Sequence, residues 1–326
     1  MHRLVFATQK LDPGDPVLAA TVPMVRALAE RVDELVVLCD TAVPDAVPHN
    51  VRVYEFGAAT QAQRGARFVR ALARSLRGQT LGVVAHMVPL YAVLAAPLVR
   101  PRRIPLVLWY THWKGHAVVR AAERLCTAVA SVDERSFPLR SSKVHAIGHG
   151  IDVAEFSCTP PPAGEPLRVL VLGRYSPAKG LETILRAGAL AGARVEAHGS
   201  DETFESYRRE LAHAFPDAVL SGPVPRTQVP ELFARSHVLV NNMRAGAPDK
   251  VVYEAAASCV PVVASNPVFD DLLPPELRFH RDDVEGLAER LRTLDRHRRP
   301  ELRGLVVARH SVEHWADELL ATVRPR

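Results

Sequence analysis

The chain has 326 residues, too many for one typical hydrophobic core, and this length suits two domains of about 150 residues each. Hydrophobic residues make up 48% and charged residues 24%, the proportions of an ordinary soluble globular protein. The net charge of +5 suits anionic substrates or a membrane surface, or reflects only an arginine-rich genome.

The four cysteines, Cys39, Cys126, Cys158 and Cys259, show no Cys-x-x-Cys spacing. We therefore expect neither a disulfide framework nor a zinc site, and reduced thiols are the default. The first residues lack the pattern of a signal peptide, and the apolar stretch Leu81–Val99 is broken and too short for a bilayer span. These features predict a cytoplasmic protein.

The first half alternates short apolar runs with helical patterns. Strands are predicted at Leu4–Ala7, Glu34–Cys39, Val51–Tyr54, Leu81–Ala85 and Leu106–Tyr110, and helices at Val17–Arg31, Gln61–Arg77 and Leu90–Val99. Near-continuous apolar strands that alternate with helices indicate a parallel sheet covered on both faces.

The Pro-rich segment Cys158–Pro166 predicts a stiff linker, after which the same rhythm returns. Strands are predicted at Leu167–Leu172, Val195–Ala197, Val238–Val240 and Val260–Ala264, and helices at Leu181–Ala191, Glu202–Ala214, Pro230–Arg235, Asp249–Ser258 and Val312–Val323. We predict two doubly wound, Rossmann-like α/β domains with a cleft between their strand C-termini. Residues 1–156 form the first domain, 157–166 the linker and 167–309 the second domain, while the helix at 310–326 packs back on the first.

Two loops of the second half carry cations directly after apolar strands. VLVLGRYSPAKG ends a strand at Gly173 and presents Arg174 and Lys179, and AGAPDKVVYEAAASCVPVVAS leads into a helix with Lys250 and Glu254. Two of the chain's five lysines therefore lie in these loops, whereas the whole chain has thirty-six arginines. Cations at a strand end beside a helix start are typical of phosphate binding, so the pair predicts a bound diphosphate.

At these residues the chain resembles the GT-B glycosyltransferases, and within them the retaining family 4, or group 1, enzymes. The matching segments are GRYSPAKG at Gly173–Gly180, SGPVPRTQVPELFARSHVLV at Ser221–Val240 and DKVVYEAAASCVPVVAS at Asp249–Ser265. Weaker matches in the first half are Val83–Pro89, Val107–Trp113 and Gly148–Phe156. The resemblance implies transfer of a sugar from a nucleoside diphosphate sugar of UDP or GDP type, the co-substrate, to a hydroxyl of a small-molecule, glycan or lipid-linked acceptor, with no other cofactor.

The resemblance also implies roles for individual residues. Arg174 and Lys179 would stabilise the leaving diphosphate, and His112 would align the reacting groups. Donor-binding residues would be Gly173, Val224, Gly246, Ala247, Lys250 and Glu254, and acceptor-side residues would be Asp12, Gly14, Asp15 and His86. Glu254 would accept hydrogen bonds from the ribose; the alternative is a Lys250–Glu254 pair one helical turn apart. The alternative for the loop cations is that solvent surrounds them.

Three positions depart from the family pattern. Gly246 stands where the family commonly has a glutamate that touches the donor sugar. The first loop, residues 9–16, lacks the usual pair of glycines, and Cys259 replaces a glycine at the end of the donor helix. The first two departures affect the expected sugar and acceptor contacts, while the diphosphate site keeps its motif.

Five arginines, Arg64, Arg67, Arg70, Arg74 and Arg77, repeat at spacings of three and four and so share one helical face. This face could meet a phosphorylated acceptor or the anionic inner surface of a membrane, or be a solvated basic face. No aromatic residues alternate with the arginines, so nucleic acid is not expected as a partner. No Asp-x-Asp motif occurs, so we expect activity without a metal.

Two other functions remain open. A nucleotide-sugar 2-epimerase shares the two-domain plan but needs carboxylates around the sugar, and Gly246 removes one. A non-catalytic GT-B partner would bind the nucleotide sugar without turnover. A dehydrogenase is disfavoured because no Gly-x-Gly-x-x-Gly follows the first strand.

Overall fold

The computed structural model describes residues 2–15, 18–43 and 47–323. The chain divides into two compact units. The first unit comprises Met1–Asp152 and Arg309–Arg326, and the second unit comprises Val153–Ala308. The Pro-rich segment 157–166 therefore belongs to the second unit.

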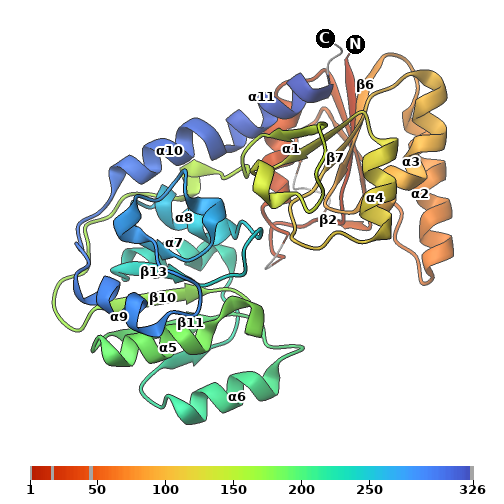
Figure 1. Ribbon diagram of the computed structural model, residues 1–326. Coiled ribbons are helices and arrows are strands. Elements are labelled where there is room, and N and C mark those ends of the chain that lie inside the picture. Colours follow the sequence, from red (N-terminus) through yellow and green to blue (C-terminus); the bar gives the residue numbers. More distant parts are fainter. Residues whose placement is uncertain (1, 16–17, 44–46, 324–326) are drawn as a thin grey trace. The chain divides into compact units, whose positions relative to one another are not determined.

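The first unit is built on a seven-stranded parallel sheet with the order β5-β3-β1-β6-β7-β8-β9 (Figure 1). Its strands are β1 (Arg3–Ala7), β3 (Glu34–Cys39), β5 (Val51–Glu55), β6 (Thr80–His86), β7 (Leu106–Trp109), β8 (Ala128–Ser131) and β9 (Val144–Ala146). The five predicted strands are confirmed to within one residue at each end, whereas β8 and β9 were not predicted. A small parallel pair, β2 (Lys10–Leu11) and β4 (Thr41–Ala42), lies beside the first loop.

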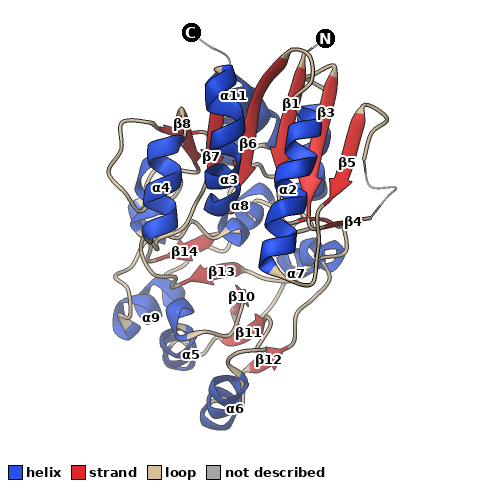
Figure 2. Ribbon diagram, turned by 90° about the vertical axis from the view of Figure 1, so that its right-hand side faces the viewer, coloured by secondary structure: helices blue, strands red, loops and turns tan. Residues whose placement is uncertain are grey.

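Helices cover both faces of this sheet (Figures 1 and 2). One face carries α1 (Thr21–Ala29) and α11 (Val312–Val323), and the other carries α2 (Gln61–Ser75), α3 (Pro89–Val99) and α4 (Ala117–Leu125). Because successive strand residues point to opposite faces, Val5, Ala85 and Leu108 pack under α2–α4, whereas Phe6 and Trp109 meet Trp315 of α11. The predicted start of α1 at Val17 lies outside the described residues.

The second unit has a five-stranded parallel sheet with the order β12-β11-β10-β13-β14. Its strands are β10 (Arg168–Leu172), β11 (Arg194–His198), β12 (Val219–Ser221), β13 (Val238–Asn241) and β14 (Val262–Ala264). Its helices are α5 (Leu181–Leu190), α6 (Glu205–Ala214), α7 (Val229–Ala234), α8 (Lys250–Ala257) and α9 (Val284–Arg292), and α10 (Pro300–His310) leads back toward the first unit along the chain. The prediction of two Rossmann-like α/β domains is confirmed.

A disulfide joins Cys158 to Cys259, whose Cα atoms are 5.1 Å apart. The expectation that all four thiols are reduced was therefore wrong for this pair. The two cysteines are 101 residues apart in the sequence, so only the folded structure shows that they are neighbours. Cys259 also adopts a positive φ of 59° just after α8, the conformation for which glycine is favoured. Cys39 and Cys126 are free and buried, and burial raises the pKa of each thiol to about 12.

Candidate functional site

The loop after β10 places Lys179 over Gly173. Gly173 has φ 136°, and a side chain there would begin 2.7 Å from the Lys179 Nζ atom. Only a residue without Cβ leaves this space to the lysine. The Lys179 ammonium is therefore held at the carboxyl end of β10, where a parallel α/β sheet binds its ligands.

A carboxylate from the neighbouring strand's loop meets this cation. Lys179 Nζ donates to Asp249 Oδ2 at 2.6 Å, and Asn241 Nδ2 donates to the same oxygen at 2.7 Å. Asp249 directly precedes α8, yet its side chain does not cap the helix. The side chains of Lys179 and Asp249 are 17% and 18% exposed, so the pair is accessible to a ligand. Sequence reasoning missed Asp249 and Asn241.

Arg174 follows Gly173 but differs from Lys179 in its surroundings. Its side chain is exposed, and it makes no ion pair with any residue that the structure describes. The structure therefore holds one of the two predicted cations in place and leaves the other in solvent.

The small-residue loop before α8 is held by Asn266, which comes shortly after β14. The Asn266 amide donates to the carbonyl oxygens of Arg244, at 3.0 Å, and Ala247, at 2.8 Å, while its oxygen accepts from the Gly246 N–H at 3.3 Å. Asn266 is only 3% exposed. Gly246 has φ 79°, which a residue with Cβ adopts with strain. Gly246 and Ala247 thus form a fixed loop without bulky side chains.

Glu254 is bound by an arginine that the sequence analysis did not consider. Arg226 donates to Glu254 at 2.7 Å and forms a second ion pair with Glu155 at 2.6 Å. The expected alternative, an ion pair between Lys250 and Glu254, is absent from the described residues, so it was wrong. Arg226 and Glu254 are 28 residues apart, too far for a helical spacing rule to detect.

Lys250 lies half-buried among these charges. Burial lowers the pKa of Lys250 to about 8; the charge of Glu254 opposes the shift, and that of Arg226 adds to it. Val224, predicted to bind the donor, lies half-buried in the loop between β12 and α7, shortly before Arg226.

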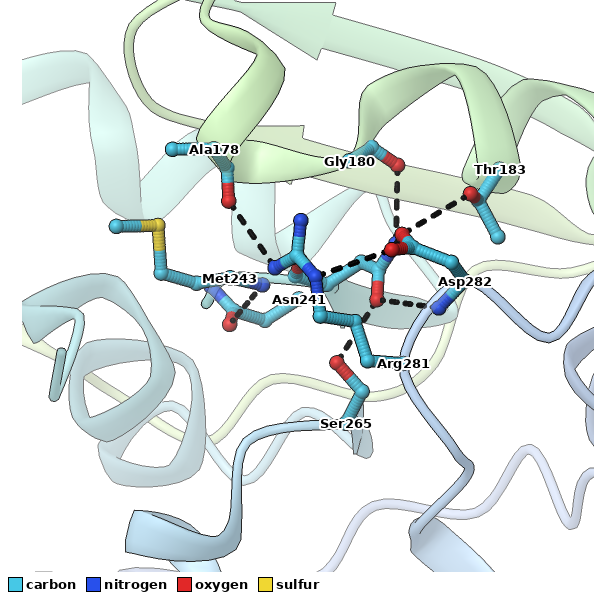
Figure 3. A network of polar contacts seen from close by, with 9 residues as sticks. Ala178, Gly180, Thr183, Asn241, Met243, Ser265, Arg281 and Asp282 are labelled. Carbon is cyan, nitrogen blue, oxygen red and sulfur yellow. Dashed lines mark hydrogen bonds and ion pairs between the residues drawn. The ribbon is translucent and has the colours of Figure 1, made fainter. Parts of the chain in front are cut away.

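Asn242, just after β13, ties the Lys179 loop to the segment before α9. Figure 3 shows the network around it, with Gly180 and Asp282 on the two segments that it joins. Its amide donates to the Gly180 carbonyl at 3.2 Å and to Asp282 at 3.0 Å, and its oxygen accepts from Ser265 at 2.8 Å. Arg281 reinforces the link by donating to the backbone carbonyls of Asn242, at 2.7 Å, and Ala178, at 3.2 Å. This network fixes the backbone on both sides of Lys179.

In the first unit, His112 lies in the loop after β7. Its Nδ1 atom accepts a hydrogen bond from the Lys114 N–H at 2.9 Å, and its ring stacks on Trp113. A neutral imidazole whose Nδ1 accepts carries its proton on Nε2. The Lys114 contact therefore assigns the proton of a neutral His112 ring to Nε2.

His86 is buried rather than at an open strand end. It is 5% exposed, its ring stacks on Phe6 and Trp109 at 5.2 and 4.9 Å, and Nδ1 lies 2.9 Å from Thr8 Oγ1. The alternation of side chains along β6 turns it toward the α1–α11 face. The structure thus packs His86 in the core of the first unit.

The carboxylates of the first loop, Asp12 and Asp15, bind groups in or next to the loop itself. Asp12 accepts from the Gly14 N–H at 2.8 Å, which closes a turn, and Asp15 pairs with Lys10 at 2.9 Å and accepts from the Leu18 N–H at 2.8 Å. These contacts order residues 12–15.

The five-arginine face is confirmed for the three members Arg67, Arg70 and Arg74, which lie exposed on α2. It was wrong for Arg77, because α2 ends at Ser75 and Arg77 follows it. Arg64 is on the helix but half-buried, and it pairs with Asp40 at 3.2 Å. Its position on the helix turns it toward the sheet edge. Over the ranges 2–15, 18–43 and 47–323, no helix is long and apolar enough to cross a bilayer, and no group of three or more His, Cys, Asp or Glu side chains is placed to hold a metal ion.

Comparison with known proteins identifies a domain in the second unit and the fold of the chain. Residues 166–297 match the family model described as glycosyl transferases group 1. A sucrose-phosphate synthase from Thermosynechococcus elongatus superposes with a TM-score of 0.74, at 16% identity, covering 98% of this chain and 97% of that one. A glycosyltransferase from Rickettsia africae gives 0.75 at 11% identity, covering 99% and 97%. The chain has the GT-B fold, and its residues 166–297 form a glycosyl transferases group 1 domain.

The same fold also occurs outside the transferases. A UDP-GlcNAc 2-epimerase from Methanocaldococcus jannaschii resembles this chain with a TM-score of 0.60, at 10% identity and 98% coverage of both chains. Among curated protein sequences no relative matches. The group 1 match covers the predicted donor residues Gly173–Lys179 and Gly246–Glu254, and the residues that sequence reasoning missed beside them.

Proposed function

We propose that this protein is a retaining glycosyltransferase of the family 4 type, which transfers a sugar from a nucleoside diphosphate sugar to a hydroxyl of its acceptor. The observation that carries the proposal is the position of Lys179, at the end of β10 and 2.6 Å from Asp249 at the start of α8. The Lys179 cation lies beside the N-terminus of α8, and the fixed loop of small residues precedes that helix. Such an arrangement is typical of a site that binds a diphosphate.

In the ligand-free protein, Asp249 neutralises Lys179. A bound diphosphate would displace the carboxylate, because it offers more negative charge to the ammonium and lies nearer the N-terminus of α8. Exposed Arg174 is long enough to fold onto the same ligand. Gly246 and Ala247 leave room for the sugar, and Glu254, held by Arg226, would accept from the ribose.

In the proposed step, the bond between the anomeric carbon and the diphosphate oxygen breaks, and its electron pair stays on the diphosphate. Lys179 and Arg174 stabilise that charge. The acceptor oxygen bonds to the anomeric carbon on the same face, and the departing phosphate takes the acceptor's proton. His112 Nε2–H would donate a hydrogen bond to the donor sugar nucleotide, in line with the tautomer that the Lys114 contact at Nδ1 favours. The cations would replace a metal ion.

The acceptor is proposed to lie on the first unit, and Arg67, Arg70, Arg74 and Arg77 favour one that bears negative charge. Peripheral contact with an anionic membrane is the other role open to this face. A 2-epimerase needs carboxylates around the sugar, and residues 245–247 provide none.

A thermal-shift screen with UDP, GDP, dTDP and their sugars tests the donor assignment. A ligand at a hundred times its dissociation constant stabilises by about 2.7 kcal/mol. NMR of the first-formed product should show the anomeric configuration of the donor, and turnover should survive EDTA. An inverted anomer would exclude retention, an epimerised nucleotide sugar would identify an epimerase, and binding without turnover would indicate a partner subunit.

A further inference from the structure

The first unit contains an open groove between α2 and α3, and none of the residues assigned to the donor lines it. Its volume is about 820 Å³, within the range of small-molecule sites. Three aromatic side chains, Phe56, Phe68 and Tyr91, form its floor, with ring centroids 5.1 to 5.4 Å apart. Figure 1 shows the two helices side by side on one face of the seven-stranded sheet.

The α2 wall of the groove consists of small residues. They recur at helical spacing: Ala62, Gly65, Ala66, Val69 and Ala73. A side chain at Gly65 would begin 3.8 Å from Leu94 Cδ1 on α3, so this position has space that the chain leaves unfilled. Across the groove Leu90 is 44% exposed. The wall and floor are thus apolar, yet open to solvent.

The surroundings of the groove are strongly basic. Residues 56–122, which include both helices, contain ten lysines and arginines and no aspartate or glutamate. Arg64 and Arg70 line the groove, and Arg70 is exposed with no ion pair to any residue in the described ranges. Arg64 pairs with Asp40, which leaves Arg70 as the cation of this pair without a counter-ion among the described residues. An apolar trough beside such a cation is complementary to an aliphatic chain with an anionic head.

One end of the groove is polar and lies at the carboxyl edge of the sheet. Gln9 and Asp40, which follow β1 and β3, line this end. Gln9 also begins the first loop, which contains Asp12 and Asp15 and is the expected acceptor side. A ligand lying along the groove would therefore present one end to that loop.

We propose that the groove holds the aliphatic tail of the acceptor, an amphiphile whose phosphate or other anionic head binds Arg64 and Arg70. The identification of this ligand as the acceptor rests on the proposed function. Binding of the amphiphile itself does not, because every residue invoked belongs to the first unit.

Isothermal titration with octyl, decyl and dodecyl phosphate, each below its critical micelle concentration, measures how the binding affinity depends on the length of the alkyl tail. Each added methylene should strengthen binding by about fourfold while it enters the groove. Dodecyl maltoside, with the same tail and no charge, should bind at least tenfold more weakly than dodecyl phosphate. Inorganic phosphate that binds as well as dodecyl phosphate, or affinity independent of tail length, would overturn the proposal.

Matched variants locate the site. Ala66→Leu fills the wall and Arg70→Gln removes the head contact, and each should weaken dodecyl phosphate binding at least tenfold. Ala212→Leu, at an exposed alanine of α6, and Arg74→Gln, on the same helix but outside the groove, should bind like wild type. Equal losses in Arg70→Gln and Arg74→Gln, in the titration and in sedimentation with phosphatidylglycerol vesicles, would show diffuse attraction to an anionic surface and refute the groove.

Thermal shifts with nucleotides in the same variants separate this inference from the proposed function. We expect Ala66→Leu and Arg70→Gln to respond to nucleotides like wild type. If nucleotides bind but alkyl phosphates do not, the groove proposal alone fails. If alkyl phosphates bind with the expected tail dependence but no nucleotide does, the groove stands as a lipid site and its identification as the acceptor site fails.

Discussion

The carboxyl ends of the two parallel sheets carry opposite kinds of side chain. In the second unit, Lys179, Asp249 and Asn242 follow the strands and are held by ion pairs and backbone carbonyls. In the first unit, His86 and Trp109 end neighbouring strands and stack 4.9 Å apart under α11. The indole N–H groups of Trp109 and Trp315 have no partner among the described residues.

This difference shows that one topology serves two purposes. A polar edge with fixed groups suits a charged ligand, because little reorganisation is needed when charge develops. The aromatic edge instead packs the sheet against α11, so contacts to a ligand in the first unit have to come from loops and from the α2–α3 layer. The following variants test whether the strand ends of the first unit serve packing and those of the second unit serve binding of a charged ligand.

The largest effect is expected for Trp315→Ala in the aromatic cluster. Truncating a buried tryptophan costs about 3–5 kcal/mol of unfolding free energy. All three tryptophans lie in the first unit, so urea unfolding followed by the remaining two reports on that unit. Trp315→Phe, which keeps a ring and removes the unpaired N–H, should cost less than about 1.5 kcal/mol. Equal stability of wild type and Trp315→Ala would contradict the packing role.

Next in size are Lys179→Ala and Arg174→Ala at the polar edge. Each should lower turnover by about two orders of magnitude, equivalent to about 2.7 kcal/mol. The reason is that each variant removes one positive charge that stabilises the leaving group. Arg209→Ala, on the exposed face of α6, is the matched control and should react like wild type. Unchanged rates in folded Lys179→Ala protein would refute the diphosphate site.

A smaller loss of stability and turnover is expected for Asn242→Ala. This variant leaves the Gly180 carbonyl and Asp282 without their amide partner. Unpaired buried groups of this kind cost about 1–3 kcal/mol. Hydrogen exchange should speed up at residues 177–183, and turnover should fall with it, since this loop carries Lys179. Asn50→Ala, which breaks amide contacts in the first unit, should leave exchange in that loop unaltered. Protection that persists in Asn242→Ala would mean that the network does not hold the loop.

The smallest signal concerns the protonation of Lys250. With its pKa lowered to about 8, roughly half of these side chains are neutral at pH 8. A nearby diphosphate favours the charged form and raises this pKa, so binding should take up about half a proton at pH 8 and almost none at pH 6. Calorimetry in buffers of different ionisation enthalpy measures this uptake. Lys250→Met should abolish it, and an identical uptake in that variant would exclude Lys250 as its source.

The sequence was sufficient for most of the fold. β3 at Glu34–Cys39 and α11 at Val312–Val323 were predicted with their observed ends, because a run of apolar residues or a clear helical period bounds each. β9, with the sequence VHA, and β12, with VLS, are too short for an alternation to be recognised. α4 begins after a loop with no capping side chain, which removes the usual start signal.

The site was predictable only where a motif lies in one stretch of chain. Lys179 and Gly246 follow from local sequence, but the partners Asp249 and Arg226 act across 70 and 28 residues, which no spacing rule connects. Asn242 and Asn266 could have been found, because both come just after buried strands that end at the ligand-binding edge. The disulfide partner of Cys259 could not, since it depends on where the folded chain brings Cys158.

The return of α11 to the first unit makes the second unit an insertion within the first along the chain. A ribosome therefore releases every residue of the second unit before Trp315 can cover Phe6 and Trp109. At about 5–20 residues per second this delay is on the order of ten seconds. During that time the nascent chain exposes an aromatic sheet face that chaperones can bind. The domain that is made first is thus completed last.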